Sequence, residues 1–323
     1  MKAIVLRRYG SPDVLRLEEI AEPPVGDDQV RVKVRATAVN DWDWAMVRGK
    51  PYIYRLLFGL RRPKVRVLGA EVAGVVEAVG SSVTKFRPGD AVYGDISDAG
   101  FGGFAEYVSV QQDALSPMPA GMTFEQAAAL PHAAGLALQG LIEVGQIRSG
   151  ESVLINGAGG GVGTLGVQIA KQFGATVTGV DGAAKLGMLR SIGFDDVIDF
   201  RAEDFTRRGK RYDLILDTKT NRSPWSYLRC LNPGGRYVTV GGDVSGLLQI
   251  GCLGLAFRRP RGKQLRIVML KPNQGLDVLN ELFAKNQLRW VIDGPYPLSE
   301  APQALRRFGD AEHLGKIVIS VSA

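Results

Sequence analysis

The sequence predicts an α/β protein with a doubly wound parallel sheet in its second half and a β-rich first part. From Glu151 onward, short β-branched runs alternate with segments whose apolar residues recur at helical spacing, which is typical of a parallel sheet covered by helices. Before residue 120, short β-branched runs are separated by turn-forming glycine and proline, which predicts a barrel-like sheet.

A βαβ unit over residues 151–181 is the best-defined element. A buried strand at 152–156 precedes a glycine-rich loop, a helix at 164–173 and a strand at 176–180. N–H groups at a helix N-terminus bind a diphosphate, and a Cβ in the loop would collide with the ligand or the next strand. An acidic residue, Asp181, follows the last loop glycine by 18 positions, which favours a dinucleotide site over a plain connector. The expected cofactor contacts in the loop are Gly157, Gly159, Gly160, Gly161, Val162 and Gly163.

The other elements follow from the same patterns. Strands are expected at 3–6, 15–19, 29–38, 72–79, 91–93, 104–108, 196–198, 213–217, 236–240, 265–270 and 316–321. Helices are expected at 127–129, 136–144, 183–192, 202–208, 223–231, 275–286 and 299–308. Thr123 and Gln126 resemble a capping box, and the aromatic, basic stretch 41–64 predicts a short helix and a loop. We expect the last strand to return to the first sheet.

Composition restricts the classes of protein and partner. The chain has 323 residues and a net charge of +7, which fits anionic small ligands or weak polyanion binding. Its two cysteines, Cys230 and Cys252, predict a reducing compartment without a disulfide framework. No apolar run reaches the roughly 18 residues of a membrane helix, and the first residues lack the pattern of a signal peptide. We therefore expect a cytoplasmic protein with no membrane partner.

Several segments, matched in order, carry a family resemblance over nearly the whole chain. They are AVNDWD (38–43), LGAEVAGVVEAVG (68–80), RPGD (87–90), GGFAEY (102–107), AALP (128–131), the glycine loop and GKIV (315–318). The chain resembles a medium-chain dehydrogenase/reductase of the zinc-independent quinone oxidoreductase, zeta-crystallin-like branch. The resemblance implies a GroES-like catalytic domain over 1–122, completed by 288–323, and a Rossmann domain over 123–287. It also implies hydride transfer from a nicotinamide.

The same resemblance argues against a metal. Zinc-dependent relatives carry Cys where this chain has Asn40 and His where it has Ala70. Catalytic zinc needs three protein ligands, and a structural zinc site needs four, commonly closely spaced cysteines, which this chain lacks. His132 and His313 are isolated in the sequence. We expect no metal site.

Catalytic candidates come from the family positions near residue 40. Asn40 matches a position beside the nicotinamide and is expected to donate a hydrogen bond to the developing oxyanion. Tyr52 is the candidate proton donor, with an ordinary wall residue as the alternative. Asp43 also matches a family position, and it is expected rather to cap or anchor the helix over 41–49. Four aromatic residues are expected to form either a wall for a flat substrate or core under the loop: Trp42, Trp44, Tyr54 and Phe58.

The choice between NADP and NAD depends on two opposed signals. Asp181 ends the second strand of the βαβ unit, where a carboxylate binds the adenosine ribose and repels a 2′-phosphate. Lys185 matches a lysine that contacts the 2′-phosphate in NADP-dependent relatives, and Phe200 replaces their usual tyrosine. The resemblance favours NADP(H) weakly and leaves NAD(H) open. Further expected contacts, after later strands, are Thr218, Gly241 and Gly242.

These observations predict metal-independent, NAD(P)H-dependent reduction of a quinone, an enone or a related small carbonyl compound. The alternatives are an alcohol dehydrogenase and a nucleotide-binding protein with little turnover, the latter because Leu136 replaces a common threonine. Two basic clusters (Arg55, Arg61, Arg62, Lys64, Arg66; Arg258, Arg259, Arg261, Lys263, Arg266) leave a polyanion open, but no nucleic-acid motif accompanies them. The family implies a homodimer through a sheet edge at 238–240 or 266–270.

Overall fold

The computed structural model describes residues 1–323 except 243, 257–261 and 322–323, and the chain forms two compact units. Unit 1 comprises Met1–His132, Pro272–Leu276 and Ile292–Ala323, and unit 2 comprises Ala133–Lys271 and Asp277–Val291. The first boundary lies after residue 132 rather than 122, because helix α3 (Phe124–Ala128) packs on the strands of unit 1. The Thr123–Gln126 capping box at its N-terminus is confirmed by reciprocal hydrogen bonds of 3.0 and 3.2 Å.

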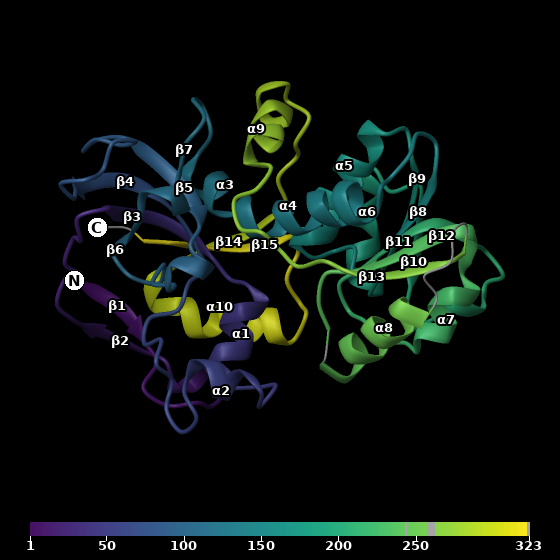
Figure 1. The fold of residues 1–323 in the computed structure, drawn as a ribbon, viewed down its shortest axis with the longest axis horizontal. Helices are drawn as coiled ribbons and strands as arrows, with labels where there is room; N and C mark the ends of the chain where they lie inside the picture. The colour runs from purple at the N-terminus through teal and green to yellow at the C-terminus, as the bar shows by residue number, and fades with distance from the viewer. Residues whose placement is uncertain (243, 257–261, 322–323) are drawn as a thin grey trace. The chain divides into compact units, whose positions relative to one another are not determined.

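Unit 1 is built on a seven-stranded sheet (Figure 1). Its strands are β3 (Gln29–Ala38), β4 (Glu71–Val79), β5 (Ala91–Asp95), β6 (Tyr107–Gln111), β7 (Ser116–Pro117), β14 (Ile292–Pro297) and β15 (Lys316–Ser320). Strand β15 pairs antiparallel with β3, so the chain's last strand does return to the first sheet. A separate hairpin joins β1 (Lys2–Val5) to β2 (Arg16–Glu19).

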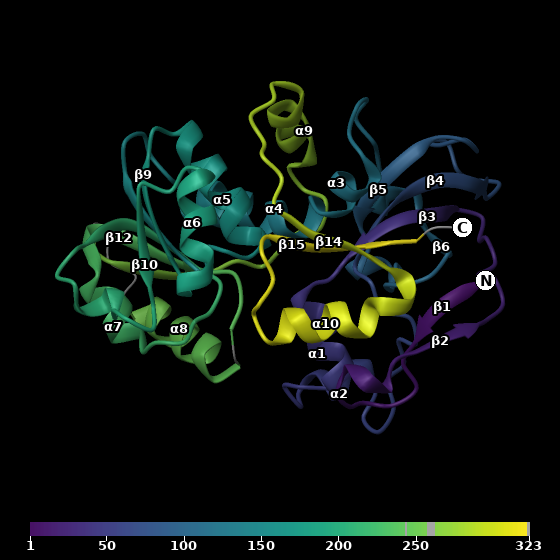
Figure 2. The ribbon, with the colours of Figure 1, turned by 180° about the vertical axis from the view of Figure 1, so that it is seen from behind.

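Alternating side chains explain the core of unit 1. On β3, Val30, Val32 and Val34 are buried, while the residues between them are at least partly exposed. The core extends to α10 (Ala301–Gly309), which contacts α1 (Asp41–Arg48) and lies beside it in Figure 2. Helix α2 (Tyr54–Phe58) follows α1, so the stretch 41–64 holds two short helices rather than one.

Unit 2 is a six-stranded parallel sheet in the order β10-β9-β8-β11-β12-β13. The strands are β8 (Ser152–Asn156), β9 (Thr176–Asp181), β10 (Asp196–Asp199), β11 (Tyr212–Asp217), β12 (Leu231–Thr239) and β13 (Gln264–Ile267). Helices α5 (Gly161–Gln172) and α6 (Leu186–Ser191) lie on one face of the sheet, and α7 (Pro224–Arg229) and α8 (Val244–Ala256) on the other (Figure 1). The remaining helices are α4 (Pro131–Leu138), which continues as a π-helix to Val144, and α9 (Leu276–Ala284).

Several expected elements need correction. The helix predicted at 164–173 begins at Gly161, and the one predicted at 202–208 is only a 3-10 turn at Phe205–Arg207. The strand predicted at 104–108 begins at Tyr107. Helix α8 and strand β14 were not predicted. Val238–Val240 cannot form a free sheet edge, because β12 is paired on both sides, whereas β13 lies at one edge of the sheet and β10 at the other.

Two general expectations can be compared with the structure. Both cysteines are free thiols, Cys230 buried and Cys252 exposed, so no disulfide forms. Among the helices in the described ranges, none has the length and apolar character needed to span a membrane.

Candidate functional site

The turn between β8 and α5 requires glycine at specific positions. Gly157 has a φ of +81°, and a Cβ there would lie 2.1 Å from Oγ1 of Thr218. A Cβ on Gly163 would lie 2.4 Å from the carbonyl oxygen of Ala158. The first turn of α5 is thereby packed directly against the loop that precedes it. This geometry leaves backbone N–H groups at the start of a twelve-residue helix, as an anion site needs.

The turn lies at the point where the strand order of the parallel sheet reverses. From β8 the chain continues to β9 and β10 on one side, and later to β11 and β12 on the other. Gly157 after β8 and Thr218 after β11 are therefore neighbours, and the Thr218 amide donates to the carbonyl of Asn156 at 3.1 Å. Ligands of open α/β sheets bind at such a switch point.

Buried polar groups hold the carboxyl ends of these strands together. Asp217 is fully buried and accepts hydrogen bonds from Asn156 Nδ2 and the Tyr237 hydroxyl, both at 2.8 Å. The amide of Thr220 also donates to Asp217, at 3.1 Å. A Cβ on Gly242 would lie 2.5 Å from Cβ of Thr220, so the loop after β12 is held against the loop after β11. Sequence reasoning missed Asp217, although an acidic residue ending a buried strand was a visible signal.

The structure brings the 2′-position candidates together. Asp181 accepts hydrogen bonds from the amides of Gly159 at 2.7 Å and Gly182 at 2.8 Å. Its carboxylate also pairs with Nζ of Lys185 at 3.7 Å, and both side chains are largely buried. Lys185 extends over the loop, since a Cβ on Gly159 would lie 2.5 Å from its Cδ. Lys185 therefore offsets the negative charge that Asp181 would present to a 2′-phosphate.

In unit 1, Asn40 is part of a buried polar cluster. Its Nδ2 donates to Glu71 Oε2 at 2.8 Å, and its Oδ1 accepts from Nζ of Lys316. Lys316 also pairs with Glu71 at 2.6 Å, with 7% and 0% of the two side chains exposed. An ammonium only donates and a carboxylate only accepts, so these two neighbours fix the orientation of the amide. The second Nδ2 hydrogen has only a weak contact, 3.4 Å from the carbonyl of Ala38.

This cluster does not fit zinc. By the resemblance described above, Asn40 and Ala70 stand where zinc-dependent relatives carry Cys and His, and Glu71 is already paired with the ammonium of Lys316. Zinc requires several Cys, His or carboxylate ligands around one point. Over the residues that the structure describes, no group of three or more such side chains is placed to hold a metal ion.

His132 is isolated in the sequence but not in the fold. Its Nδ1 lies 2.7 Å from Asp95 Oδ2 and its Nε2 lies 3.2 Å from Asp41 Oδ1. Burial alone would lower the pKa of His132, but the hydrogen bonds to both carboxylates outweigh burial and raise the pKa to about 10. The backbone amide of His132 also donates to Glu71 at 2.8 Å, which connects it to the Asn40 cluster. His313 instead stacks on Phe308.

Asp43 has the anchoring role expected of it. Its carboxylate accepts from the amide of Asn40 at 2.9 Å, at the N-terminus of α1, and from the amide of Gly69 at 2.8 Å. Burial raises the pKa of Asp43 to about 7, against the opposing effect of these two N–H donors. Asp43 thus ties α1 to the residue before Ala70.

Three of the four predicted wall aromatics are in contact. The Trp42 ring lies 5.7 Å from Tyr54 and 6.2 Å from Phe58 between centroids, and Phe101, which was not predicted, joins them at 6.3–6.4 Å. Trp42 and Phe58 also pack on the core of unit 1, as expected for core under the loop, and their part in a substrate wall stays a prediction. Trp44 is separate, because it packs against Gly309 of α10.

Tyr52 lies outside this aromatic group. Its side chain is 66% exposed, and Arg55 and Lys50 lie over its ring at 5.0 and 5.8 Å. Tyr54 is half-buried, and burial raises the pKa of its hydroxyl. Tyr54 is thus shielded from water, and its raised pKa keeps the hydroxyl protonated until a strong base accepts the proton.

The sequence analysis also named Leu136, Phe200 and a second basic cluster. Leu136 is buried on α4, and Phe200 lies beside Gly182 at the end of β10. Of the second basic cluster, Arg258, Arg259 and Arg261 lie outside the described residues, while Lys263 and Arg266 donate to backbone carbonyls.

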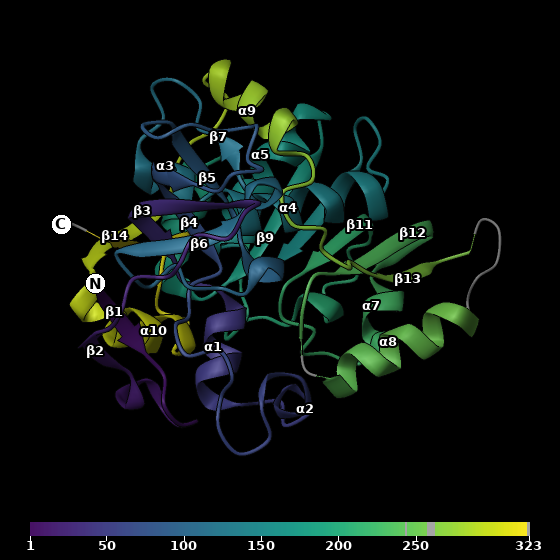
Figure 3. The ribbon, with the colours of Figure 1, turned by 60° about the vertical axis from the view of Figure 1, so that its left-hand side comes forward.

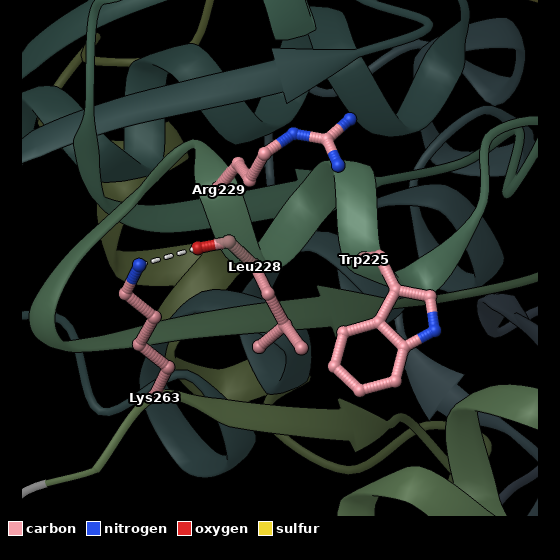
Figure 4. A pocket seen from close by; sticks show the side chains of 4 residues that line it. All are labelled: Trp225, Leu228, Arg229 and Lys263. Carbon is pink, nitrogen blue, oxygen red and sulfur yellow. Dashed lines mark hydrogen bonds between the residues drawn. The ribbon is translucent and has the colours of Figure 1, made fainter.

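Lys263 also borders a surface hollow shown in Figure 4, whose lining residues are Trp225, Leu228, Arg229 and Lys263. None of the predicted catalytic or cofactor-binding residues lines this hollow.

A glycine turn at the switch point of a parallel sheet defines unit 2 as a dinucleotide-binding unit. Residues 26–120 match the alcohol dehydrogenase GroES-like domain family, and residues 192–319 match the zinc-binding dehydrogenase family. Together these matches span both units. The chain belongs to the medium-chain dehydrogenase/reductase superfamily.

Individual relatives agree with this assignment. The chain is 34% identical over 330 residues to a 2-methylene-furan-3-one reductase of Solanum lycopersicum, covering 99% of this chain and 79% of the relative. It is 32% identical, with the same coverage, to the chloroplastic NADPH-dependent alkenal/one oxidoreductase of Arabidopsis thaliana. The solved quinone oxidoreductase of Coxiella burnetii has a TM-score of 0.87 and 28% identity, covering 100% of this chain and 99% of that one.

Proposed function

We propose that the chain catalyses NAD(P)H-dependent reduction of enones, quinones or related carbonyl compounds by hydride transfer. The observation that carries the proposal is the β8–α5 turn, where Gly157 and Gly163 keep Cβ atoms out of the switch point. The family assignment and the reductases among its relatives support the same reaction. When bound, the dinucleotide supplies the hydride.

In this proposal, Asn40 stabilises the substrate oxygen. Lys316 and Glu71 orient its amide, and the Nδ2 hydrogen with only the 3.4 Å contact is the one that reaches the substrate. One such donor in a site without water stabilises a developing oxyanion strongly. We propose that the reaction proceeds without zinc, with the amide of Asn40 as the polarising group and Lys316 and Glu71 holding that amide in place.

For the proton, we propose the half-buried Tyr54 as the donor, with Tyr52, the residue indicated by the sequence, as its rival, because Tyr52 is 66% exposed. Trp42, Tyr54 and Phe58 form an apolar wall suited to a flat substrate. The loop residues Gly157–Gly163 bind the diphosphate, and Thr218, Gly241 and Gly242 complete the cofactor contacts after β11 and β12.

NADP(H) is the proposed cofactor, with NAD(H) as the competitor. The Lys185–Asp181 pair supports this choice, because the lysine charge offsets the carboxylate. We further propose a cytoplasmic homodimer that pairs through β13, which is one of the edge strands of the sheet of unit 2.

The direct test is oxidation of NADPH and NADH in the presence of a panel of quinones and α,β-unsaturated ketones. We expect turnover with at least one acceptor and a lower KM for NADPH than for NADH. Dinucleotide binding without oxidation by any acceptor would instead favour a nucleotide-binding protein with little turnover. The observation that favours this second candidate is that Glu71 and Lys316 already bond both ends of the Asn40 amide, which leaves at most one Nδ2 hydrogen for a substrate.

The cofactor preference has its own test. Lys185→Ala is expected to weaken NADPH binding about tenfold and to leave NADH binding almost unchanged, since a 2′-phosphate loses a charged partner. Asp181→Ser should instead raise the affinity for NADPH relative to the affinity for NADH. Calorimetric titration of both variants measures these shifts. Unchanged NADPH affinity in Lys185→Ala would remove the lysine from the 2′-phosphate site.

A further inference from the structure

Helix α2 and its flanks expose an unusual number of large apolar side chains. Ile53, Leu56, Leu57 and Leu60 are 51%, 69%, 66% and 65% exposed. These four make up more than a third of the eleven large hydrophobic side chains that are exposed over the described residues, yet they lie within eight positions. Concentrated exposure of this kind marks an interaction site.

The surroundings of these side chains are strongly cationic. Residues 44–70 contain seven lysines and arginines and no acidic residue. Arg61, Arg62, Lys64 and Arg66 follow Leu60 directly and are all exposed. We call Ile53, Leu56, Leu57 and Leu60, with these four cations, the α2 surface.

Hydrogen bonds and aromatic contacts hold the opposite side of α2 against the rest of unit 1. The Tyr9 hydroxyl donates to the carbonyl of Gly59 at 2.6 Å, and Nε of Arg55 donates to the carbonyl of Gly49 at 3.0 Å. Phe58 packs on Trp42 and Phe101. The leucines therefore stay exposed while their neighbours are anchored. Helix α2 itself lies at the periphery of unit 1, beside α1 (Figure 3).

We propose that the α2 surface docks the protein peripherally on a lipid bilayer that contains anionic lipids. A bilayer matches both features, because apolar side chains enter the headgroup–acyl boundary while Lys and Arg attract anionic headgroups. A second copy of this chain is a poorer match, since a two-fold contact would place the cations against one another. A nucleic acid would pair with the cations and leave the leucines in water.

This docking differs from the expectation of no membrane partner, which rested on the absence of a spanning segment. Lying on a bilayer needs no such segment. The proposal also does not depend on the proposed reaction, so its test uses neither cofactor nor substrate, and the two proposals fail separately.

The test is co-sedimentation of the full chain with vesicles of phosphatidylcholine, alone or mixed with phosphatidylglycerol. We expect binding to the anionic vesicles only, weakened by salt. Leu56→Ser/Leu57→Ser should lower the apparent partition coefficient by about tenfold or more, because two apolar anchors are lost. Arg61→Gln/Arg62→Gln should lower it roughly thirtyfold. The matched control is Leu17→Ser/Leu248→Ser, which changes two leucines that are 45% and 63% exposed elsewhere, and it should bind as the unmodified chain does.

Each other outcome overturns the proposal. Absence of binding to anionic vesicles would do so directly. Binding that salt abolishes but Leu56→Ser/Leu57→Ser leaves unchanged would show that apolar insertion plays no part. An oligomer that Leu56→Ser/Leu57→Ser dissociates in size-exclusion chromatography, without vesicle binding, would assign the surface to a second copy. Circular dichroism of each variant confirms that these exposed substitutions leave the fold intact.

Discussion

The glycine turn of unit 2 and the buried polar cluster of unit 1 are built by opposite means. In unit 2, the absence of side chains shapes the site, because Gly157 and Gly163 allow backbone segments to approach closely. In unit 1, polar and charged side chains from distant parts of the chain meet in a buried interior, as Asn40, Glu71 and Lys316 do.

The difference shows which kind of site tolerates which kind of change. A glycine turn is sensitive to added atoms, since each new Cβ meets backbone or a fixed side chain. A buried ion pair is sensitive to lost atoms, since removing one partner leaves an uncompensated charge in a medium that solvates it poorly. Three substitutions test this contrast.

The largest effect is expected for Lys316→Met, which removes the cation from Glu71. The free energy of unfolding should fall by about 3–5 kcal/mol, because Glu71 is left buried and unpaired. Denaturant unfolding of the variant measures this loss. The control is Lys285→Met, whose exposed pair with Glu281 at 3.5 Å should change stability by less than about 0.5 kcal/mol. Equal effects of the two substitutions would refute the distinction between buried and exposed cations.

A somewhat smaller effect is expected for Gly157→Ala. The positive φ and the contact with Thr218 together should cost about 2–4 kcal/mol of stability. Gly174→Ala is the matched control, because Gly174 has a φ of +65° but open space around its Cβ position. It should cost only about 1 kcal/mol. The rise in Tm on adding NADPH should persist in Gly174→Ala and be lost in Gly157→Ala; a rise in both would mean that the turn tolerates a Cβ.

The smallest change at any one step is the dependence of stability on pH that comes from His132, because it is spread over several pH units. The pKa of His132 is raised to about 10 in the fold, so the folded chain binds a proton that the unfolded chain releases near pH 6.5. The stabilisation is complete below pH 6.5 and decreases by about 1 kcal/mol per pH unit up to pH 10. The difference in unfolding free energy between the unmodified chain and His132→Gln should shrink accordingly. A difference that stays constant from pH 7 to 9 would contradict a charged His132.

The glycine turn could be predicted from the sequence because its signals are local. Strand β8 matches its predicted range, since an apolar run bounded by a turn signal identifies a buried strand. Helix α5 begins three residues early because Gly161 and Gly163 weaken the helical pattern, although both lie within the helix. Helix α8 went unpredicted for a related reason, since three glycines interrupt its apolar run.

The buried polar cluster could not be predicted, because its contacts join residues that are distant in sequence. His132 contacts Asp95 and Asp41 across 37 and 91 residues, and no periodic pattern in the sequence indicates such a pairing. Asn40 was singled out by resemblance alone, and its partners Glu71 and Lys316 were read only as parts of matched segments. The position of Tyr52 on the exterior likewise depends on how α2 packs, which a propensity pattern does not contain.

The position of Lys316 on β15 also sets an order of events during synthesis. Asn40 and Glu71 leave the ribosome hundreds of residues before the ammonium that neutralises them, which is 276 positions beyond Asn40. A nascent chain therefore has every other part of this cluster while Glu71 still lacks its cation. The polar interior of unit 1 is completed only when one of the last strands to be translated is added to the sheet.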